Sequence, residues 1–355
     1  MKNEPSNFDE ITHSIDFSSS TGLPVVVKVS RGGMTESIHR GVIAICDSDG
    51  GVYKDLGDIE RPIYPRSAIK AIQAIPVVES GASEAFGMDS AEIALCCASH
   101  RGEAIHVDRV ISWLKRLSLC EQYLECGPQM PSNQDAAKAL ILENSPATRA
   151  HNNCSGKHAG MITTAVHLGE PINGYVSQDH QIQIRLIRLM EELGDINLCE
   201  TARGIDGCGI PVFGIPVKNV AIAMAKMADP KRLTNERQSA CNIIAQSCKA
   251  NPLMISGTGS FNSLIQSEVP DGCIVKSGAE GICTASIPHL GLGICLKIDD
   301  GAGRAASALM LSILNQLAVI DDAGVKRINK SEVTEIRNWS GHLVGQIQVP
   351  SNFLF

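Results

Sequence analysis

Short runs of apolar, β-branched residues near the start of the chain predict strands. Residues 25–29 read VVVKV, and residues 42–45 and 52–53 form a second and a third apolar run. The segment DSDGG between the last two supplies the Asp and Gly residues that a hairpin turn needs. The pattern therefore predicts a small antiparallel sheet at the start of the fold.

Further along the chain, apolar residues recur mainly at helical spacing. The first predicted helix lies in YPRSAIKAIQAIP, where Ser67 stands at the N-terminus and Pro76 is expected to end the helix. Two runs between the later helices, CIVKSG and GICLKIDDG, favour strands. Together these elements predict an α/β (α+β) body in which mixed sheets pack with helices. The other predicted helices cover residues 104–117, 135–143, 157–168, 181–193, 220–227, 234–249 and 302–320.

No internal repeat, low-complexity tract or long linker divides the sequence. Residues 1–22 form a polar arm, and residues 23–355 are predicted to form a single domain, with two closely packed lobes as a variant of this arrangement. The first twenty residues lack the apolar core of a signal peptide, and no unbroken apolar run reaches 18 residues. The sequence therefore predicts a cytoplasmic protein without a membrane partner.

Composition supports a globular protein and argues against nucleic acid as a partner. The chain has 355 residues, of which 44% are hydrophobic and 19% charged, so it can bury a large core. Its net charge of -7 gives no basic surface for nucleic acid, which is not expected as a partner. The 13 cysteines are odd in number and many lie in apolar segments, so most are predicted to be reduced core residues rather than disulfides.

Two short motifs could together form a nucleophilic site. Ser67 and Lys70 form an S-x-x-K at a predicted helix start, where three residues bring the amine onto the same face as the hydroxyl. Lys276 begins a K-S-G at the end of a predicted strand, and K-[ST]-G accompanies S-x-x-K in Ser-Lys acyl enzymes. S-x-x-K alone often occurs by chance, but the pair is more informative. The S-D-N motif of β-lactamases and penicillin-binding proteins is missing, which argues against that identity.

A third segment, CCASHRGE, carries a second candidate hydroxyl. The apolar run of residues 93–97 resembles a strand, and polar residues that follow a buried strand commonly point into a cleft. Ser99 is then a second nucleophile candidate and Lys276 a second amine. In the alternative interpretation, Ser99 caps the next helix and His100 is a surface residue.

The segment HNNCSGKHAG, residues 151–160, admits several interpretations. A phosphate-binding Walker loop is excluded, because histidines stand where the motif requires Gly and Ser or Thr. Cys154 and His158 are four residues apart, a spacing that suits metal binding or activation of a thiolate. Cys208 follows Asp206 in the Gly-rich segment GIDGCGIP, and two cysteines in tight loops with a nearby His or Lys could hold zinc. The alternative is that both cysteines are buried thiols without a ligand.

Taken together, the motifs resemble the asparaginase II family, the class 3 or rhizobial-type L-asparaginases. The resemblance rests on SRGGMTESIHRG, RSAIK, CCASH, NNCSGKHAGM, GIDGCGIP, KSGAEG and GLGICLKIDDG in this order, and it runs from about residue 25 to about residue 304. It implies a fold like that of serine β-lactamases and glutaminases, and a homodimer. Asn262 is a departure, because close relatives have a cysteine at this position.

The resemblance also implies roles for particular residues. Two Ser-Lys pairs would be catalytic, a zinc ion would bind near them, and three further residues would line the substrate site. A lysine that binds zinc must be neutral. The implied residues are Ser67 with Lys70 and Ser99 with Lys276 for catalysis, Cys154, Lys157 and Cys208 for zinc, and Arg66, His158 and Asp206 for the substrate.

The activity that the resemblance implies is hydrolysis of L-asparagine to L-aspartate and ammonia through an acyl-enzyme. Ser67 is the expected nucleophile with Lys70 as base, although Ser99 remains an alternative nucleophile. Asp206 and Arg66 suit the α-ammonium and α-carboxylate of the substrate. Two other functions fit parts of the pattern: hydrolysis of another amide, such as glutamine or a small peptide, and binding of an amino acid without catalysis.

Overall fold

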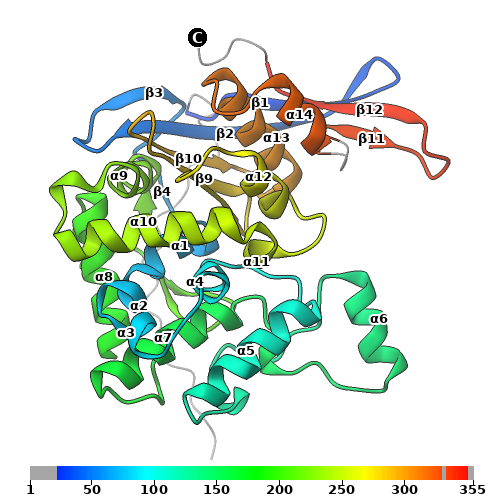
Figure 1. Ribbon diagram of the computed structural model, residues 1–355. Helices are drawn as coiled ribbons and strands as arrows, with labels where there is room; N and C mark the ends of the chain where they lie inside the picture. Colours follow the sequence, from blue (N-terminus) through cyan, green and yellow to red (C-terminus); the bar gives the residue numbers. More distant parts are fainter. Residues whose placement is uncertain (1–21, 330–332, 351–355) are drawn as a thin grey trace, which may run out of the picture.

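The computed structural model describes residues 22–329 and 333–350 (Figure 1). An antiparallel sheet crosses the upper part of the view in Figure 1, and a helical layer lies below it. This mixed arrangement confirms the predicted α/β (α+β) class. The predicted polar arm of residues 1–22 lies outside the described residues, except for Gly22.

The main sheet has eight strands in the order β11-β12-β1-β2-β10-β9-β8, with β3 paired to β2. The pairing of β2 with β3 is antiparallel and confirms the predicted hairpin. Two small sheets pair β4 with β7 and β5 with β6. The bounds are β1 Val25–Arg31, β2 Met34–Asp47, β3 Val52–Leu56, β4 Pro62–Ile63, β5 Arg203–Ile205, β6 Pro211–Phe213, β7 Ile215–Pro216, β8 Ile274–Gly278, β9 Ile282–Ile287, β10 Leu292–Ile298, β11 Glu335–Arg337 and β12 Leu343–Gln348.

The predicted helices are present within a few residues of their expected ends. Short 3₁₀ turns connect several of them: η1 Arg66–Ile69, η2 Glu121–Tyr123, η3 Arg149–His151 and η4 Pro230–Arg232. The α-helices are α1 Lys70–Gln73, α2 Ile75–Glu79, α3 Ala82–Ala85, α4 Ser90–Cys96, α5 Ala104–Arg116, α6 Gln134–Leu142, α7 Ser155–Leu168, α8 Gln181–Gly194, α9 Val217–Ala228, α10 Asn235–Ala250, α11 Pro252–Ser256, α12 Phe261–Glu268, α13 Gly303–Gln316 and α14 Asp322–Asn329.

The centre of the sheet is buried on both faces. Along β10, Ile294 and Leu296 belong to the core that α13 covers, whereas Cys295 belongs to the core under α9. This alternation follows the two-residue period of a strand. Gly293 allows α9 to pack closely, because a Cβ there would lie 2.1 Å from the Ala221 carbonyl oxygen.

Two sequence predictions about local structure are wrong. Residues 93–97, expected as a strand, lie in and just after α4, whose residues 91–96 are all buried. A helix buried on all sides has no polar face, so its short apolar run resembles a buried strand. Pro76 does not end a helix but stands in the first turn of α2, where the missing N–H has no intrahelical partner to lose.

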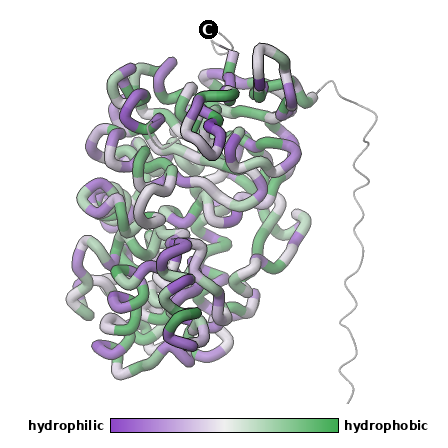
Figure 2. The backbone as a smooth tube through the Cα atoms, turned by 90° about the vertical axis from the view of Figure 1, so that its right-hand side faces the viewer, coloured by the Kyte–Doolittle hydropathy of each residue, from purple (hydrophilic) through white to green (hydrophobic). Residues whose placement is uncertain are grey.

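The cysteines agree with the prediction of a reduced core. All thirteen are free thiols, and only Cys120 and Cys199 are exposed. Along the described chain, apolar and polar stretches alternate in both layers (Figure 2). No helix in this part of the chain is long and apolar enough to cross a bilayer.

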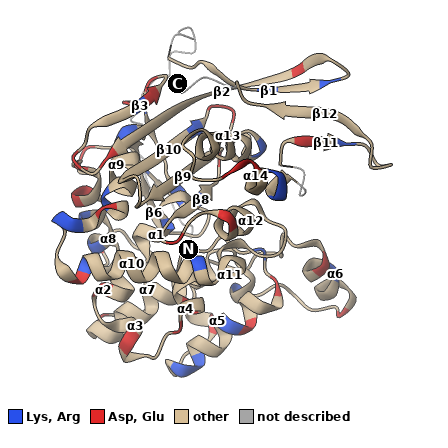
Figure 3. Cartoon of the chain, turned by 45° about the horizontal axis from the view of Figure 1, so that its top comes forward, with Lys and Arg blue, Asp and Glu red and all other residues tan. Residues whose placement is uncertain are grey.

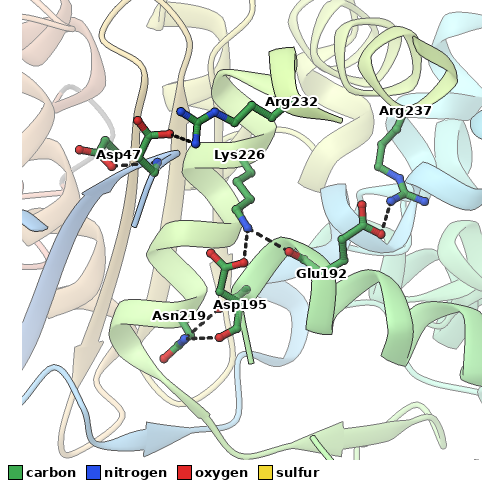
Figure 4. A network of polar contacts seen from close by, with 9 residues as sticks. Asp47, Glu192, Asp195, Asn219, Lys226, Arg232 and Arg237 are labelled. Atoms are coloured by element: carbon green, nitrogen blue, oxygen red, sulfur yellow. Dashed lines mark hydrogen bonds and ion pairs between the residues drawn. The ribbon is translucent and has the colours of Figure 1, made fainter. Parts of the chain in front are cut away.

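Charged side chains of both signs are interspersed over the molecule (Figure 3). At one edge, ion pairs connect α8, α9 and α10 (Figure 4). Lys226 of α9 contacts Asp195 at 2.5 Å, just after α8, and Arg237 of α10 contacts Glu192 of α8 at 2.5 Å. Arg237 also reaches Glu79 of α2 at 2.6 Å, so the polar edge fixes the helical layer around its apolar core.

Candidate active site

A cleft of about 450 Å³ opens where segments far apart in the sequence meet. Six of the ten residues assigned to the site from the sequence line it: Arg66, Ser67, Ser99, Cys154, Asp206 and Cys208. The other four, Lys70, Lys157, His158 and Lys276, are buried and are not among the lining residues. The hydroxyls, the thiols and the ion pair therefore face the cleft, while the lysine amines lie in the protein behind it.

The turn that carries Ser67 is held tightly in place. Arg66 adopts a φ of 47°, a left-handed conformation that costs energy for a side chain with a Cβ. The turn is fixed from the other side by the Thr284 hydroxyl of β9, which donates to the Ala68 carbonyl oxygen at 2.7 Å. Gly278 at the end of β8 leaves room for this approach, because a Cβ there would lie 3.0 Å from the Ala68 nitrogen.

Lys70 makes contacts that the sequence did not predict. Its Nζ donates to the Ser99 hydroxyl at 3.0 Å and to the Cys154 Sγ at 3.2 Å, and it also donates to the Ala98 carbonyl oxygen. Within the described residues, the Ser67 hydroxyl has no hydrogen-bond partner. The structure therefore joins Lys70 directly to Ser99, and Ser67 stands in the cleft with a free hydroxyl three residues before Lys70.

Lys276 lies on β8 and is 1% exposed. Its Nζ donates to the Ser277 carbonyl oxygen at 2.6 Å. Burial lowers the pKa of Lys276 to about 7, and the charge of Lys70 acts in the same direction. A substantial fraction of this amine is therefore neutral near pH 7 and can accept a proton.

The side chains of Cys154, Lys157 and Cys208 converge. The Lys157 Nζ donates to the Cys208 Sγ at 3.0 Å. A hydrogen bond from Cys208 and the charges of Lys70 and Lys157 hold the pKa of Cys154 well below its usual range, although burial opposes them. The same hydrogen bond, together with burial, raises the pKa of Cys208. The two thiols therefore share one negative charge, which the lysine amines balance.

This donor set fits a zinc ion. Two thiols and one amine meet in a buried position, and thiolate sulfur is a preferred zinc ligand. Zinc bound at such a set would displace the protons of Cys208 and Lys157. Burial lowers the pKa of Lys157, but the charges of Cys208 and Cys154 raise it by more, so its amine is protonated in this structure. The described part of the chain has no cluster of three His, Cys, Asp or Glu side chains placed to hold a metal. A site built on Cys154 and Cys208 therefore needs Lys157 as its third donor, rather than His158.

His158 is buried next to the zinc-ligand candidate Lys157 and does not line the cleft. Its Nδ1 contacts the Tyr175 hydroxyl at 2.7 Å, and its buried Nε2 has no partner in the described residues. Burial lowers the pKa of His158 well below its ordinary value, so the ring is neutral. The side chain is completely buried, and its implied contact with substrate stays a prediction.

Arg66 and Asp206 form an ion pair on the cleft wall. The Arg66 Nε and Nη2 each lie 2.8 Å from the Asp206 Oδ1. Burial raises the pKa of Asp206, but the charge of Lys157 and the hydrogen bond from Arg66 lower it by a larger amount. The pKa of Asp206 therefore lies below its usual value. The wall therefore presents a fixed carboxylate and a guanidinium side by side.

Several functional neighbours were not identified from the sequence. Gln129, Asn152 and Asn153 line the cleft, and the Asn152 Oδ1 accepts from the backbone N–H of Cys154 at 2.9 Å. The paired asparagines before Cys154 were a signal for such a loop-fixing role, because Asn side chains often bond to the backbone two residues on. Asn262, which departs from the family pattern, accepts from the Ser277 N–H at 2.9 Å and so supports the strand that carries Lys276.

The fold and the cleft define a mixed α/β protein with two serine hydroxyls and three buried lysines at one site. A family model described as L-asparaginase II matches residues 27–349, nearly the whole chain. The chain therefore belongs to the asparaginase II family, as the sequence motifs predicted. No curated protein sequence matches the chain.

Solved structures show a more distant similarity. Mglu in its native form is 15% identical with a TM-score of 0.40, over 82% of this chain and 60% of that one, so the chain spans about three-fifths of Mglu. A β-lactamase from Mycobacterium bovis is 12% identical, with a TM-score of 0.38, over 78% of this chain and 93% of that one. A D-alanine carboxypeptidase AmpC from Burkholderia cenocepacia is 14% identical, with a TM-score of 0.38, over 77% and 93%. Since these TM-scores are below 0.5, the family assignment rests on the family model.

Proposed function

We propose that the protein is an L-asparaginase that hydrolyses L-asparagine to L-aspartate and ammonia. The observation that carries the proposal is the hydrogen bond of 3.0 Å between the Lys70 amine and the Ser99 hydroxyl, beside the free hydroxyl of Ser67 in the cleft. Membership of the asparaginase II family supports the amide as the bond that is cleaved.

Substrate binding is assigned to the ion pair on the cleft wall. Asparagine carries an α-ammonium and an α-carboxylate, which match the Asp206 carboxylate and the Arg66 guanidinium. When the substrate binds, Asp206 contacts its α-ammonium and Arg66 contacts its α-carboxylate, and each gives up part of the ion pair with the other. Asp206→Asn and Arg66→Met should therefore raise KM more than they lower kcat.

The chemical steps are assigned to the two serines and two lysines. The Ser67 oxygen attacks the side-chain amide carbon, and Lys70 accepts the hydroxyl proton, which requires the Lys70 amine to be neutral when substrate is bound. The C–N bond then breaks, and the nitrogen leaves as ammonia after it takes a proton from the relay of Lys70 and Ser99. Lys276, whose pKa is about 7, accepts a proton from the water that hydrolyses the aspartyl ester. The water oxygen enters the product carboxyl group, the ester C–O bond breaks, and the proton held by Lys276 passes to the Ser67 oxygen.

Zinc is proposed as the cofactor, with Cys154, Lys157 and Cys208 as its ligands. Bound zinc supplies a fixed positive charge next to the cleft. A zinc ion held by Lys157, Cys154 and Cys208 would replace the protons of Lys157 and Cys208 and would tie the start of α7 to the loop that follows β5. The three side chains thereby fix the position of the cleft wall that carries Asp206.

A homodimer and a cytoplasmic location complete the proposal. Light scattering on the purified chain should give twice the monomer mass of 37.8 kDa, and a monomer at micromolar concentration would contradict the dimer. Fractionation of cells that express the natural protein tests the location.

Ammonia release from a panel of amides tests the proposed activity. L-Asparagine, L-glutamine and small peptide amides are compared for the wild type and for Ser67→Ala, with Lys297→Met as a control on a lysine outside the cleft. We expect the highest kcat/KM for asparagine, and a loss of about 10³-fold or more in Ser67→Ala. A preference for another amide would assign the same machinery to that substrate. Calorimetric binding of asparagine without ammonia release would identify an amino-acid-binding protein.

A further inference from the structure

The backbone of Ser99 is fixed independently of its side chain. The Ser99 N–H donates to the Ile255 carbonyl oxygen at 3.0 Å, and the Ser256 hydroxyl donates to the Ser99 carbonyl oxygen at 3.1 Å. Both contacts come from α11, on one side of the Ser99 segment. These two bonds do not reach the other side of the segment, where Lys70 contacts Cys154.

His100 makes that second connection. Its N–H donates to the Asn153 carbonyl oxygen at 3.1 Å, and its Nε2 lies 2.8 Å from the Ser155 hydroxyl. The two contacts thus reach the residues on either side of Cys154. Because the Lys70 amine contacts both Ser99 and Cys154, the bonds of His100 and Lys70 form a closed ring between the two segments.

The hydrogen bonds define which nitrogen of His100 carries the proton. The Gly102 N–H donates to the His100 Nδ1 at 3.2 Å, so Nδ1 is the acceptor. The Ser155 hydroxyl donates to the Ala150 carbonyl oxygen at 2.9 Å, so its oxygen is free to accept from Nε2–H. The ring is 1% exposed and its polar atoms are all paired. Burial and the nearby His106 and Lys70 lower the pKa of His100, which keeps it neutral.

We propose that His100 is a positioning residue that holds the Ser99 hydroxyl against the Lys70 amine through its hydrogen bond to Ser155. The proposal rests on the proposed Ser-Lys function of the cleft. His100 does not line the cleft and touches no reacting atom. Its effect is geometric, because a catalytic group displaced by about 1 Å can lose about 10²-fold in rate.

Two substitutions of His100 separate its two side-chain hydrogen bonds. Asn places an amide oxygen near the position of Nδ1, so His100→Asn keeps the bond from Gly102 and loses the bond to Ser155. Gln places its amide NH₂ near Nε2, so His100→Gln keeps the bond to Ser155 and loses the bond from Gly102. If positioning acts through Ser155, kcat should fall about 10- to 100-fold in His100→Asn and recover largely in His100→Gln, with KM changed less than about threefold in both.

His180→Asn is the matched control. The His180 Nδ1 also accepts from the N–H two residues on, Ile182, at 3.2 Å, and its Nε2 donates to the Pro171 carbonyl oxygen at 2.8 Å. His180→Asn therefore loses a bond from Nε2, as His100→Asn does, but at a position away from the cleft. Its kcat should equal that of the wild type, even if its Tm falls.

Ser155→Ala removes the other partner of the same bond. It should lower kcat as His100→Asn does, and the double variant should lose no more than the larger single loss, because both act through one contact. This variant also keeps the proposal testable if His100→Asn does not fold. Additive losses in the double variant, or equal kcat values in His100→Asn and His100→Gln, would overturn the proposal.

A fluorophosphonate probe separates this proposal from the choice of substrate. The probe forms a bond from a reactive serine oxygen to phosphorus and releases fluoride, so it needs the serine and its base but no asparagine. We expect rapid labelling of the wild type, slow labelling of His100→Asn and recovery in His100→Gln. If the same pattern appears in a protein that releases no ammonia, the asparaginase proposal fails and the positioning role stands. If the wild type is not labelled, the positioning role fails.

Discussion

The chemistry of the cleft depends on which lysine amine is neutral. Lys276 is the candidate, because burial lowers its pKa to about 7. The K-S-G motif identified this residue from the sequence, but not its degree of burial. The contact between Lys70 and Ser99 was not predictable, since 29 residues separate them and the i,i+3 spacing pointed to Ser67 instead. Local spacing predicts neighbours on one helix, whereas this pairing depends on how the loop after α4 packs against α1.

The pH dependence of kcat/KM follows from the pKa of Lys276. Below about pH 7 the amine is protonated and cannot accept a proton, and above it the free base predominates. Activity should therefore rise with pH through about 7 and then level off. Lys276→Arg should lower kcat/KM by at least 10²-fold and remove this step, because guanidinium stays protonated.

Lys297→Arg provides the control for that profile. The Lys297 amine also donates to the carbonyl oxygen of the next residue, Ile298, but it lies outside the cleft lining. Its profile should match that of the wild type. A Lys276→Arg variant that keeps the step near pH 7 would assign the step to another group.

At the scale of the elements, α9 packs closely on β10. This packing supports the sheet in which β9 lies between β10 and β8, the strand that carries Lys276. The sequence predicted both elements, but not their approach, because a glycine in a strand pattern has several possible causes. The same limit explains α4, where a fully buried helix gave an apolar run without a helical period. The short buried helix α4 was mistaken for a strand, whereas the longer α7, in which residues 155–165 are all buried, was predicted as a helix.

Gly293→Ala tests that packing. A Cβ at Gly293 would lie 2.1 Å from backbone atoms of α9, and backbone cannot move aside as a flexible side chain can. The free energy of unfolding should fall by about 3 kcal/mol or more, measured by urea denaturation. Gly303→Ala is the matched control, since a Cβ at this first residue of α13 meets nothing within 4 Å. A fall in Gly303→Ala equal to that in Gly293→Ala would contradict the packing argument.

For the whole molecule, the class of fold and the family could be predicted from the order of the motifs. The arrangement of the site could not, because the cleft is assembled from residues that span positions 66 to 279. The sequence could not show that Cys154 and Cys208 share one negative charge that the lysine amines balance, because this depends on burial and distance. It also could not show that His158 turns toward Tyr175.

Zinc should stabilise the whole molecule, because it joins two distant segments of the chain. A chelator should lower Tm, and added zinc should restore it, with about one zinc per chain by elemental analysis. Cys208→Ala should remove the zinc-dependent part of Tm. Cys199→Ala, which removes an exposed thiol, should retain it. Full zinc occupancy in Cys208→Ala would exclude the proposed ligand set.

The most direct test of the account is mass spectrometry of the protein quenched in acid during turnover of L-asparagine. The account predicts an aspartyl ester on the peptide that contains Ser67, absent from Ser67→Ala and more abundant when Lys276→Arg slows hydrolysis of the ester. An adduct on Cys154 or Ser99 instead, or ammonia release at an undiminished rate by Ser67→Ala, would contradict it.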